Sequence, residues 1–220
     1  MKGVTIVTAT YNERENIPKL VKRIRKVLSG IPNEIIVVDD SSPDGTYDVA
    51  RKLVDLAVKR RREGQTKCLL LGIKLARYPI VVTIDADLEN PPELIPKLLE
   101  FFNEKECDLL IASRRHLPRF SEILASKTLG VLIEISDVFS NFRVYKKECM
   151  TDVKLKLGET FGAELLVIPW SKGYEICEYL YDPPPRRRNP RIGGKVKANL
   201  RIIWALIKTF CLITYLAFSR

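Results

Sequence analysis

Residues 80–93, with the sequence IVVTIDADLENPPE, constrain the fold of this chain most strongly. The first five are apolar or β-branched, which is typical of a strand buried on both faces of a parallel sheet. Asp85 and Asp87 follow with one small residue between them, so an extended backbone would direct both carboxylates to the same side. Two prolines then end the strand, and a helix is expected over residues 93–102. The segment therefore predicts an α/β fold with two carboxylates at a strand end.

The two carboxylates predict a metal site. The carboxyl ends of strands are where open α/β sheets bind their ligands. Carboxylates this close repel unless a cation lies beside them, and oxygen ligands that leave room for water suit Mg²⁺ or Mn²⁺. Glu89 would add a third oxygen ligand. The alternative is that Asp85 and Asp87 only end a strand and begin a turn. The strand before them and the Pro-Pro-Glu after them favour the metal site.

Two earlier predicted strands also end in polar residues that could bind a nucleotide. Residues 4–9 predict the first buried strand, and in the loop after it Tyr11 would stack on a base while Asn12 or Glu13 would contact the base edge or ribose. The alternative is that this loop is only a helix start capped by Asn16.

Residues 34–38 predict the second strand, and it ends in Asp39 and Asp40, which would hold ribose hydroxyls. A helix is expected from Thr46 to about Leu53, and the basic residues 59–62 are expected to be a solvated helix end. No glycine-rich loop follows the first strand, which argues against a dinucleotide dehydrogenase. A metal would then hold the diphosphate.

Residues 109–112 predict another buried strand, with Arg114 at its end. This cation would face the diphosphate, and a surface salt bridge is the alternative. His116, the one histidine, has no second ligand or base near it in sequence and receives no role. A loop and a strand are expected in residues 137–148, and a last strand over residues 176–181.

The positive charge of the chain is confined to its C-terminal end. The formal net charge is +10, but nine of the 37 basic residues and no acidic residue lie in residues 183–220. The basic cluster lacks interleaved aromatic residues until it meets an apolar run, so nucleic-acid binding is not expected. With 46% hydrophobic residues, the chain can bury the core of one domain.

The five cysteines predict neither a disulfide framework nor a zinc site, because they are far apart and include no Cys-x-x-Cys pair. Reduced, buried cysteines of a cytosolic domain are expected. No secretory signal is expected either, because polar and charged residues interrupt the first apolar run. The cysteines are Cys68, Cys107, Cys149, Cys177 and Cys211.

Five stretches together resemble a known family. They are TATYNERENI, EIIVVDDSSPDGT, Gly64 with Gly72, DADLENPPE, and the pair IASRR and SNFRVYKKE, in order over about residues 3–180. With them the chain resembles glycosyltransferase family 2 and, within it, the polyprenyl (dolichol) phosphate mannose synthases. The resemblance implies a GT-A fold, a Rossmann-like, mostly parallel sheet flanked by helices. It also implies a nucleotide-diphospho-sugar donor and a divalent cation, Mg²⁺ or Mn²⁺.

The resemblance implies roles for individual residues as well. Asp87, Arg114 and Arg143 would be the catalytic residues. The nucleotide would contact Ala9, Tyr11, Glu13, Asp39, Asp40 and Asp85; the metal would bind Asp85, Asp87 and Glu89; and phosphates or the acceptor would meet Arg114, Ser126, Arg143, Arg191 and Lys195.

The chain departs from the family pattern at several positions. Ala9 replaces a proline, Glu89 a glutamine, and Asn141 the glycine of Ser-Gly-Phe-Arg. Glu122 stands where relatives have an arginine four residues before Ser126. The first three departures leave the donor site intact, whereas the last alters an acceptor position. A second acceptor element, Arg-x-x-Gly-x-Ser-Lys, is retained only as Arg191, Gly193 and Lys195.

The expected function is metal-dependent, inverting transfer of mannose from GDP-mannose to a polyprenyl (dolichyl) phosphate at the cytosolic membrane face. A phosphate monoester, with a second pKa near ~6, is already a nucleophile at neutral pH and needs no general base. The alternatives are a UDP-sugar transferase, for glucose for instance, acting on a lipid phosphate or a glycan, and a non-catalytic nucleotide-sugar binder.

A tail is expected to follow a GT-A domain that spans residues 1–182, because three prolines begin the segment 183–220. As a helix, residues 202–218 would extend about 26 Å at 1.5 Å per residue, short of the ~30 Å hydrocarbon core of a bilayer. The expectation is therefore a helix that lies in the membrane interface, with Lys208 and Arg201 reaching head groups. An ordinary core helix, a dimer helix or a truncated spanning segment are the alternatives.

Overall fold

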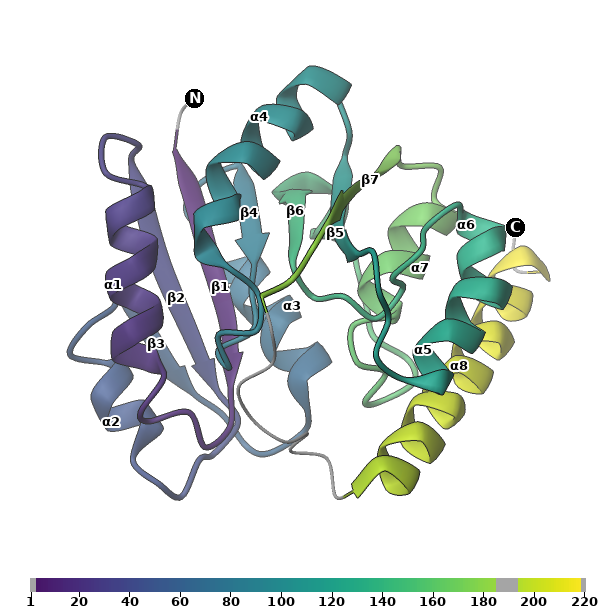
Figure 1. The fold of residues 1–220 in the computed structure, drawn as a ribbon, viewed down its shortest axis with the longest axis horizontal. Coiled ribbons are helices and arrows are strands. Elements are labelled where there is room, and N and C mark those ends of the chain that lie inside the picture. The colour runs from purple at the N-terminus through teal and green to yellow at the C-terminus, as the bar shows by residue number, and fades with distance from the viewer. Residues whose placement is uncertain (1–2, 185–193, 219–220) are drawn as a thin grey trace.

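A seven-stranded β-sheet forms the centre of the structure, a computed structural model that describes residues 3–184 and 194–218. Its strands are β1 (Val4–Thr10), β2 (Asn33–Asp39), β3 (Leu56–Lys59), β4 (Ile80–Thr83), β5 (Leu109–Arg114), β6 (Arg143–Lys146) and β7 (Ile176–Tyr181). They are ordered β3-β2-β1-β4-β6-β5-β7 (Figure 1). Only β6 is antiparallel to its neighbours, so the prediction of a mostly parallel sheet is confirmed.

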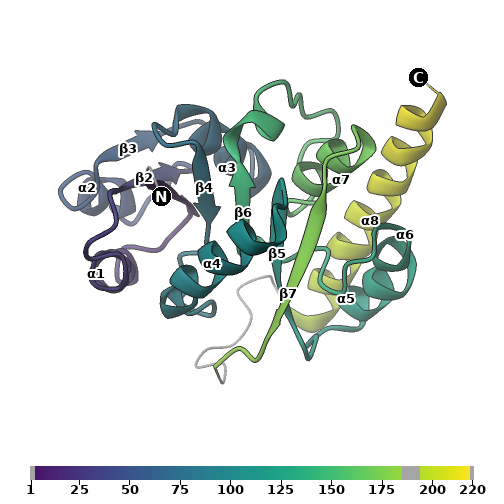
Figure 2. The same cartoon turned by 90° about the horizontal axis from the view of Figure 1, so that it is seen from above.

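Helices cover both faces of this sheet. They are α1 (Ile17–Val27), α2 (Thr46–Ala50), α3 (Gln65–Leu75), α4 (Ile95–Lys105), α5 (Phe120–Ala125), α6 (Val131–Ile133), α7 (Glu164–Ser171) and α8 (Gly194–Phe218). Short 3-10 turns occur at η1 (Pro92–Leu94) and η3 (Lys147–Met150), and a π-turn, η2 (Ser126–Gly130), joins α5 to α6. Figure 2 shows α1 and α4 on one face, α3 and α7 on the other, and α5, α6 and α8 beyond β7.

The apolar strands divide the core into two layers because successive side chains of a strand point to opposite faces. In β1, Ile6 belongs to the apolar cluster under α1 and α4, whereas Val7 belongs to the cluster under α3 and α7. Gly72 lets α3 approach this strand closely, since a Cβ there would lie 2.3 Å from Val7 Cγ1. The run of apolar residues in each central strand is thus explained by burial on both faces.

The strand order creates a switch point at β1. The chain runs outward from β1 to β2 and β3 on one side, and β4 pairs with the other side of β1. In the register, Thr10 pairs with Asp39, and Val7 pairs with Thr83. The loops that follow β1, β2 and β4 therefore meet at one edge, where open α/β sheets bind ligands.

Two predictions about the region after β2 are wrong. The helix that begins at Thr46 ends at Ala50 and not near residue 53. The basic stretch 59–62 does not end a helix, because residues 56–59 form the edge strand β3 and pair with β2. This segment has only three consecutive apolar residues, none of them buried, and pairing with a formed neighbour decides its conformation.

The prediction of five buried, reduced cysteines is wrong for three of them. Cys107 and Cys177 form a disulfide with Cα atoms 5.9 Å apart, across a sequence separation of 70 residues. The pairing of β5 with β7 brings them together, which no local spacing shows. Cys211 is exposed, whereas Cys68 and Cys149 are buried and unbonded.

Helix α8 packs against α5 and α7 along one face. The residues of this face recur at intervals of three or four and are at most 3% exposed: Ala198, Ile202, Ala205, Thr209 and Leu212. By length and composition, the segment Ala198–Phe218 is also long and apolar enough to cross a membrane. Lys208 was predicted to reach lipid head groups. Its ammonium instead donates to the carbonyls of Leu157 (3.1 Å) and Glu159 (2.6 Å).

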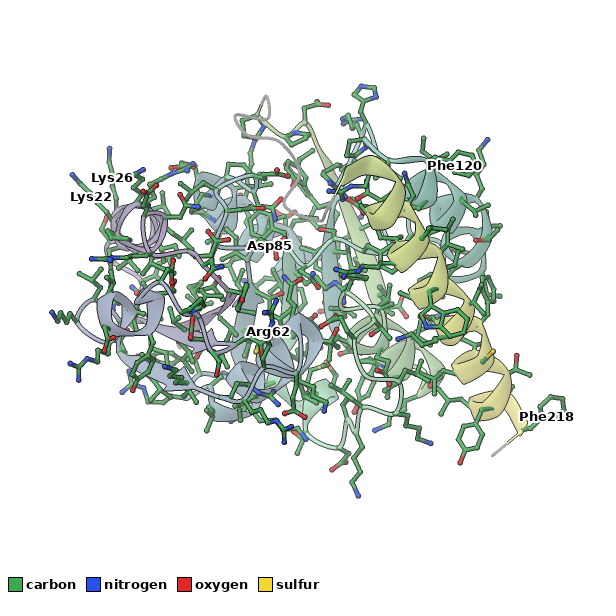
Figure 3. All side chains as sticks on the ribbon, turned by 90° about the horizontal axis from the view of Figure 1, so that it is seen from below. Lys22, Lys26, Arg62, Asp85, Phe120 and Phe218 are labelled. Carbon is green, nitrogen blue, oxygen red and sulfur yellow. A yellow bond between two sulfur atoms is a disulfide. The ribbon has the colours of Figure 1, made fainter. Side chains whose placement is uncertain are left out.

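The opposite face of α8 is exposed and apolar. Its large hydrophobic residues are Leu200, Trp204, Ile207, Phe210, Tyr215 and Phe218. Neighbouring α5 and α6 expose further apolar side chains, among them Phe120 and Val131, at 68% and 70%. Figure 3 shows Phe120 and Phe218 projecting from this end of the molecule, away from Asp85.

Candidate active site

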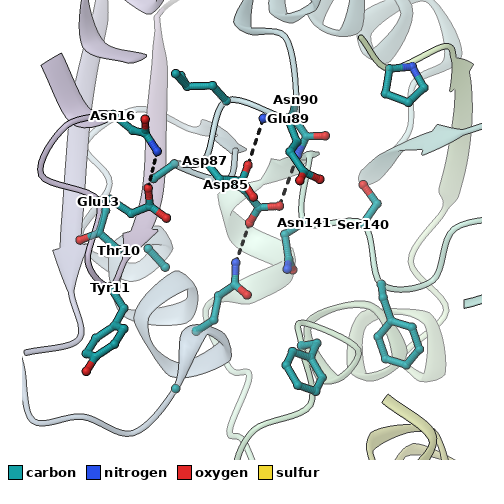
Figure 4. A pocket seen from close by; sticks show the side chains of 18 of the residues that line it. Thr10, Tyr11, Glu13, Asn16, Asp85, Asp87, Glu89, Asn90, Ser140 and Asn141 are labelled. Carbon is teal, nitrogen blue, oxygen red and sulfur yellow. Dashed lines mark hydrogen bonds between the residues drawn. The ribbon is translucent and has the colours of Figure 1, made fainter. Parts of the chain in front are cut away.

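A cleft of about 1680 Å³ opens at the carboxyl ends of β1, β2, β4 and β5. Thr10, Asp40, Asp85 and Arg114 line it, one from the end of each of these strands or the loop after it. Figure 4 shows that side chains from the first and the fourth strand-end loops face each other across it. The cleft therefore lies at the switch point of the sheet.

Three of the loops at the cleft turn through left-handed, non-glycine residues. These are Asn12 (φ 59°), Ser41 (φ 59°) and Leu88 (φ 66°). Such conformations are sparsely populated and persist where surrounding contacts enforce them. One contact is the hydrogen bond from Asn12 N to Ser42 Oγ, at 2.9 Å. The loops after β1 and β2 are thus held together as one unit.

Tyr11 and Glu13 form one end of the cleft. The Arg62 guanidinium stacks on the Tyr11 ring, 3.7 Å from its centroid, and donates to the Tyr11 hydroxyl at 2.6 Å. Glu13 is buried and accepts a hydrogen bond from Asn16 Nδ2 at 2.7 Å (Figure 4). Asn16 therefore orients Glu13 and makes no side-chain cap to α1. Arg62 was missed by the sequence prediction because it belonged to a supposed helix end.

The two neighbouring acids after β2 have different surroundings. Asp39 is 0% exposed, and its carboxylate accepts from Thr10 Oγ1 at 3.0 Å and from the amide of Ser42 at 2.8 Å. It does not line the cleft, and its hydrogen bonds join the ends of β1 and β2; its contact with the nucleoside stays a prediction. Asp40 lines the cleft and accepts from the amides of Glu63 and Gly64.

Asp85 is held by two amide side chains. Gln65 Nε2 donates to Oδ1 at 2.6 Å and Asn90 Nδ2 donates to Oδ2 at 3.3 Å (Figure 4). Burial and the nearby Asp87 carboxylate raise the pKa of Asp85 to about 7. A divalent cation beside these carboxylates would relieve their repulsion, so the donor set fits Mg²⁺ or Mn²⁺ with open positions for water and phosphate.

The Glu89 side chain does not form a three-carboxylate metal site with Asp85 and Asp87. Within residues 3–184 and 194–218, no group of three His, Cys, Asp or Glu side chains is arranged to hold a metal ion. The three carboxylates are therefore not assembled around one point in this structure, and Glu89 as a third ligand stays a prediction. Asp85 and Asp87 remain the candidate ligands, and Glu89 contributes its amide, which donates to Asp87 Oδ1 at 3.0 Å. Mg²⁺ is commonly bound by one or two carboxylates plus substrate phosphates.

A buried pair of residues supports this carboxylate from behind. The Tyr181 hydroxyl donates to Asn90 Oδ1 at 2.6 Å, and Asn90 in turn donates to Asp85. Tyr181 is the last residue of β7, so the edge strand helps to orient the candidate metal ligand. The sequence prediction assigned no role to Tyr181, Asn90 or Gln65, because their partners are distant in sequence or lack a motif.

Arg114 lies in the cleft and also forms a salt bridge, but a largely buried one and not the surface salt bridge of the alternative. Its Nε and Nη2 donate to the two carboxylate oxygens of Asp137 at 2.6 and 3.1 Å. Glu122 Oε2 lies 3.7 Å from Arg114 Nη2. Burial alone would lower the pKa of Arg114, but the Asp137 and Glu122 carboxylates raise it, so the guanidinium is a permanent cation in this part of the cleft.

The sequence model of Glycosyl transferase family 2 matches residues 5–146. The chain belongs to this family. A dolichol-phosphate mannosyltransferase of Pyrococcus furiosus is 31% identical over 226 residues, which cover 93% of this chain and 64% of that protein. An undecaprenyl-phosphate 4-deoxy-4-formamido-L-arabinose transferase of Pectobacterium atrosepticum is 33% identical over 147 residues, 62% of this chain and 44% of that protein. The family 2 chain thus spans less than two thirds of the length of these relatives.

Solved structures confirm the fold of this family 2 protein. Glucosyl-3-phosphoglycerate synthase from Mycobacterium tuberculosis, in complex with phosphoglyceric acid, matches with a TM-score of 0.76 and 22% identity, over 94% of this chain and 80% of that one. The same synthase with Mn²⁺, uridine diphosphate and phosphoglyceric acid matches with a TM-score of 0.74 and 20% identity, over 94% and 78%. The GT-A fold predicted from the sequence is therefore confirmed.

Arg143 does not reach the cleft of the family 2 protein. Its side chain is 0% exposed, and its three nitrogens donate to the carbonyls of Ser140, Gly162 and Val138 at 2.6, 2.8 and 2.9 Å. The catalytic or phosphate-binding role stays a prediction, and in this structure these three nitrogens hold the backbone. Arg143 thus fixes the loop before β6 against the loop before α7.

The remaining acceptor predictions fall outside the cleft or outside the described residues. Ser126 is half-buried at the start of η2 and does not line the cleft. Arg191 lies outside the described residues. Lys195 lies in the first turn of α8, where only the backbone is described. Ala9 lines the cleft near the end of β1, and its contact with a nucleotide stays a prediction.

Glu159 is a further residue that the sequence did not indicate. It lines the cleft, and its carboxylate accepts from Thr66 Oγ1 and from the amide of Phe161, each at 2.6 Å. Gly64 makes room for it, since a Cβ there would lie 2.0 Å from the carboxylate. Thr66 and Glu159 are 93 residues apart, and no local pattern signals their contact.

Proposed function

We propose that this protein transfers a sugar from a nucleotide diphosphate to a polyprenyl phosphate, with GDP-mannose as the donor. The observation that carries the proposal is one cleft lined by Tyr11 and Glu13 after β1, Asp85 and Asp87 after β4, and Arg114 at the end of β5, in the order of these strands across the sheet. This order matches the order of base, diphosphate and acceptor in such a transfer. The names of the curated relatives, which include a dolichol-phosphate mannosyltransferase, support a lipid-phosphate acceptor.

The residues of the cleft divide the chemistry between them. A divalent cation bound by Asp85 and Asp87 would neutralise charge on the leaving diphosphate. Gln65 and Asn90 orient the Asp85 carboxylate, and Arg114 adds a fixed positive charge near the reaction centre. An acceptor phosphate attacks without a general base, and attack from the face opposite the diphosphate inverts the anomeric centre.

A UDP-sugar is the second candidate donor. The observation that favours it is the likeness to glucosyl-3-phosphoglycerate synthase, which has been solved with uridine diphosphate and Mn²⁺. Competition between GDP and UDP for the Mn²⁺-loaded protein separates the two. We expect GDP to bind more tightly, and a preference for UDP of tenfold, or ~1.4 kcal/mol, would reverse the assignment.

We further propose that α8 lies on the cytosolic face of a membrane and brings the lipid to the cleft. Its inner face is packed on the protein, while Trp204, Ile207 and Phe218 are exposed on the outer face. An apolar face with aromatic residues, beside the basic segment 183–201, suits an interface rich in anionic lipid. A second copy of the chain, bound through α8, is the alternative occupant of this face.

Product formation tests the proposed reaction. Radiolabelled GDP-mannose, Mn²⁺ and a polyprenyl phosphate are incubated with the full chain, and label is counted in the organic extract. We expect lipid-bound label with wild type and loss of it with Asp87→Asn. Label transferred from UDP-glucose alone would support the second donor, and no transfer from either donor, with nucleotide binding intact, would identify a non-catalytic binder.

Liposome flotation tests the membrane proposal. Removing α8 would uncover its buried partners, so the test uses the exposed-face pair Trp204→Glu and Ile207→Glu in the full chain. We expect wild type to float with anionic vesicles at low salt and the double variant to remain soluble. If neither floats, and wild type sediments as a dimer that the double variant does not form, α8 is a dimer helix. If neither floats and the two sediment alike, α8 is a core helix and not a membrane element.

A further inference from the structure

The end of the cleft beyond Arg114 holds a network of two cations and two carboxylates. Asp137 is 1% exposed, and both its oxygens accept hydrogen bonds from Arg114. Glu122, on α5, is 4% exposed, and its Oε1 accepts from Arg119 Nη1 at 2.6 Å. Arg114, Arg119 and Glu122 line the cleft, whereas Asp137 does not. Glu122 is therefore the carboxylate of this network that faces the substrate space.

The other oxygen of Glu122 lacks a hydrogen-bond donor. Oε2 is buried and has no hydrogen-bond partner among the described residues, and its nearest cation is Arg114 Nη2, at 3.7 Å. A buried carboxylate oxygen left in this state is unfavourable, because it has lost water without gaining a donor. Glu122 Oε2 and the guanidinium groups of Arg114 and Arg119 thus lie around a position where the protein leaves a buried acceptor without a hydrogen-bond donor.

The position suits an anionic oxygen group. Guanidinium groups bind carboxylates and phosphates in the same way, through parallel N–H donors. With Glu122 in place, the two positive charges of Arg114 and Arg119 are balanced by two negative charges. A phosphate that entered beside both arginines would meet the Glu122 carboxylate, which accepts from Arg119 and lies 3.7 Å from Arg114 Nη2, and the like charges would repel.

The position also lies beside α8. The amide of Ser121, in the first turn of α5, donates to Asn199 Oδ1 of α8 at 3.1 Å. Arg201 and Ile202 of α8 line the same cleft as Glu122. The helix proposed to meet the membrane is therefore in contact with the element that carries Glu122.

We propose that Glu122 is an internal substitute for the phosphate of the acceptor. Its carboxylate neutralises Arg114 and Arg119 while the acceptor is absent and is displaced toward the open cleft when a phosphate monoester binds. Glu122 then determines how tightly and how selectively the acceptor is held. This inference rests on the proposed function, since it takes the acceptor group to be a phosphate.

Glu122→Gln tests the inference, because it keeps the shape of the side chain and removes its charge. Binding of a short-chain prenyl phosphate is measured by calorimetry with Mn²⁺ and GDP present, without turnover. We expect about tenfold tighter binding than wild type, a lower KM for the acceptor with an unchanged turnover rate, and unchanged affinity for GDP. Arg119→Gln should weaken prenyl phosphate binding.

Glu100→Gln is the matched control. Glu100 is exposed on α4, and its replacement changes the net charge by the same amount. It should leave the affinity for prenyl phosphate at the wild-type value. Inorganic phosphate, used as a second probe, shows whether the prenyl chain is needed for the tighter binding of Glu122→Gln.

Two outcomes would overturn the inference. One is equal or weaker binding of both phosphates by Glu122→Gln. The other is a turnover rate that falls at least 100-fold while KM is unchanged, which would make Glu122 a base that takes the proton of a hydroxyl acceptor. Failure of the proposed function is distinguishable, because it appears as absence of lipid product with wild type, whereas the phosphate-binding comparison is read without product.

Discussion

Lys208 gives the sharpest test of how α8 is joined to the cleft. Its ammonium donates to the carbonyls of Leu157 and Glu159, and no carboxylate forms a salt bridge with it among the described residues. We consider the variant Lys208→Met, in which these carbonyls lose their donor. Methionine and lysine have similar helix propensities, so the helix itself is not weakened.

The magnitude follows from the two hydrogen bonds. Hydrogen bonds to charged groups contribute about 1.5–3 kcal/mol each, and the half-buried site allows water to replace part of that contribution. We therefore expect Lys208→Met to lower the free energy of unfolding by roughly 2–3 kcal/mol. For a chain of this size, each kcal/mol changes Tm by about 2–4 °C, which gives a fall of roughly 4–12 °C.

The same substitution should weaken nucleotide binding. Lys208 holds the backbone of Glu159, whose carboxylate accepts from Thr66, and Gln65 beside it donates to Asp85. Loosening this chain of contacts disturbs the orientation of the candidate metal ligand. We expect the Kd for GDP with Mn²⁺ to rise about tenfold, or ~1.4 kcal/mol. Lys208→Arg should restore part of both effects.

The assays are urea unfolding and calorimetry at 25 °C, with Lys22→Met as the matched control. Lys22 is exposed on α1, far from α8, and its replacement changes the charge equally (Figure 3). If Lys208→Met unfolds with the same free energy as this control, the contribution assigned to the two hydrogen bonds is refuted. If stability falls while the Kd for GDP stays at the wild-type value, the coupling to the cleft is refuted.

Three further predictions concern stability. Arg143→Met should lower the free energy of unfolding by roughly 3 kcal/mol or more, because three buried carbonyls lose their donor; a loss of activity at wild-type stability in urea would contradict this. Cys107→Ser, which opens a disulfide across 70 residues, should cost about 4 kcal/mol, and a reductant should lower the stability of wild type but not of the variant. Burial would raise the pKa of Asp55, but hydrogen bonds from the Ile35 amide and Arg25 lower it below its usual value. The carboxylate therefore stabilises the fold above pH ~4, and this stabilisation is lost as the pH falls. The free energy of unfolding of Asp55→Asn should differ from that of wild type more at pH 6 than at pH 3, and equal differences at the two pH values would refute the assignment.

The sequence by itself determined six of the seven strands, all but β3, and the chemistry at the ends of the central ones. An apolar run followed by acids recurs after residues 38 and 84, and a parallel sheet places such ends along one edge. The predicted positions of Asp40, Asp85 and Tyr11 in one cleft therefore follow from local signals. The motifs also indicated the family, because their order and spacing extend over most of the chain.

Only the tertiary structure decided which of these polar residues face the cleft. Asp39 and Asp40 are adjacent, yet one is enclosed between two strands and the other lines the cleft. Arg143 matches a family motif, but its three nitrogens each donate to a backbone carbonyl, and Nη1 also donates to the Tyr145 hydroxyl. Side-chain direction depends on the packing of neighbouring elements, which sequence spacing does not report.

Contacts between distant segments were also beyond the reach of the sequence. The disulfide, the Glu159 contact with Thr66 and the anchoring of Lys208 each join residues at least 49 positions apart. The apolar run 202–218 was expected to be a helix, but its inner and outer faces were assigned only by its packing against α5 and α7. Local patterns fix secondary structure, whereas the partner of each side chain is set by the assembled core.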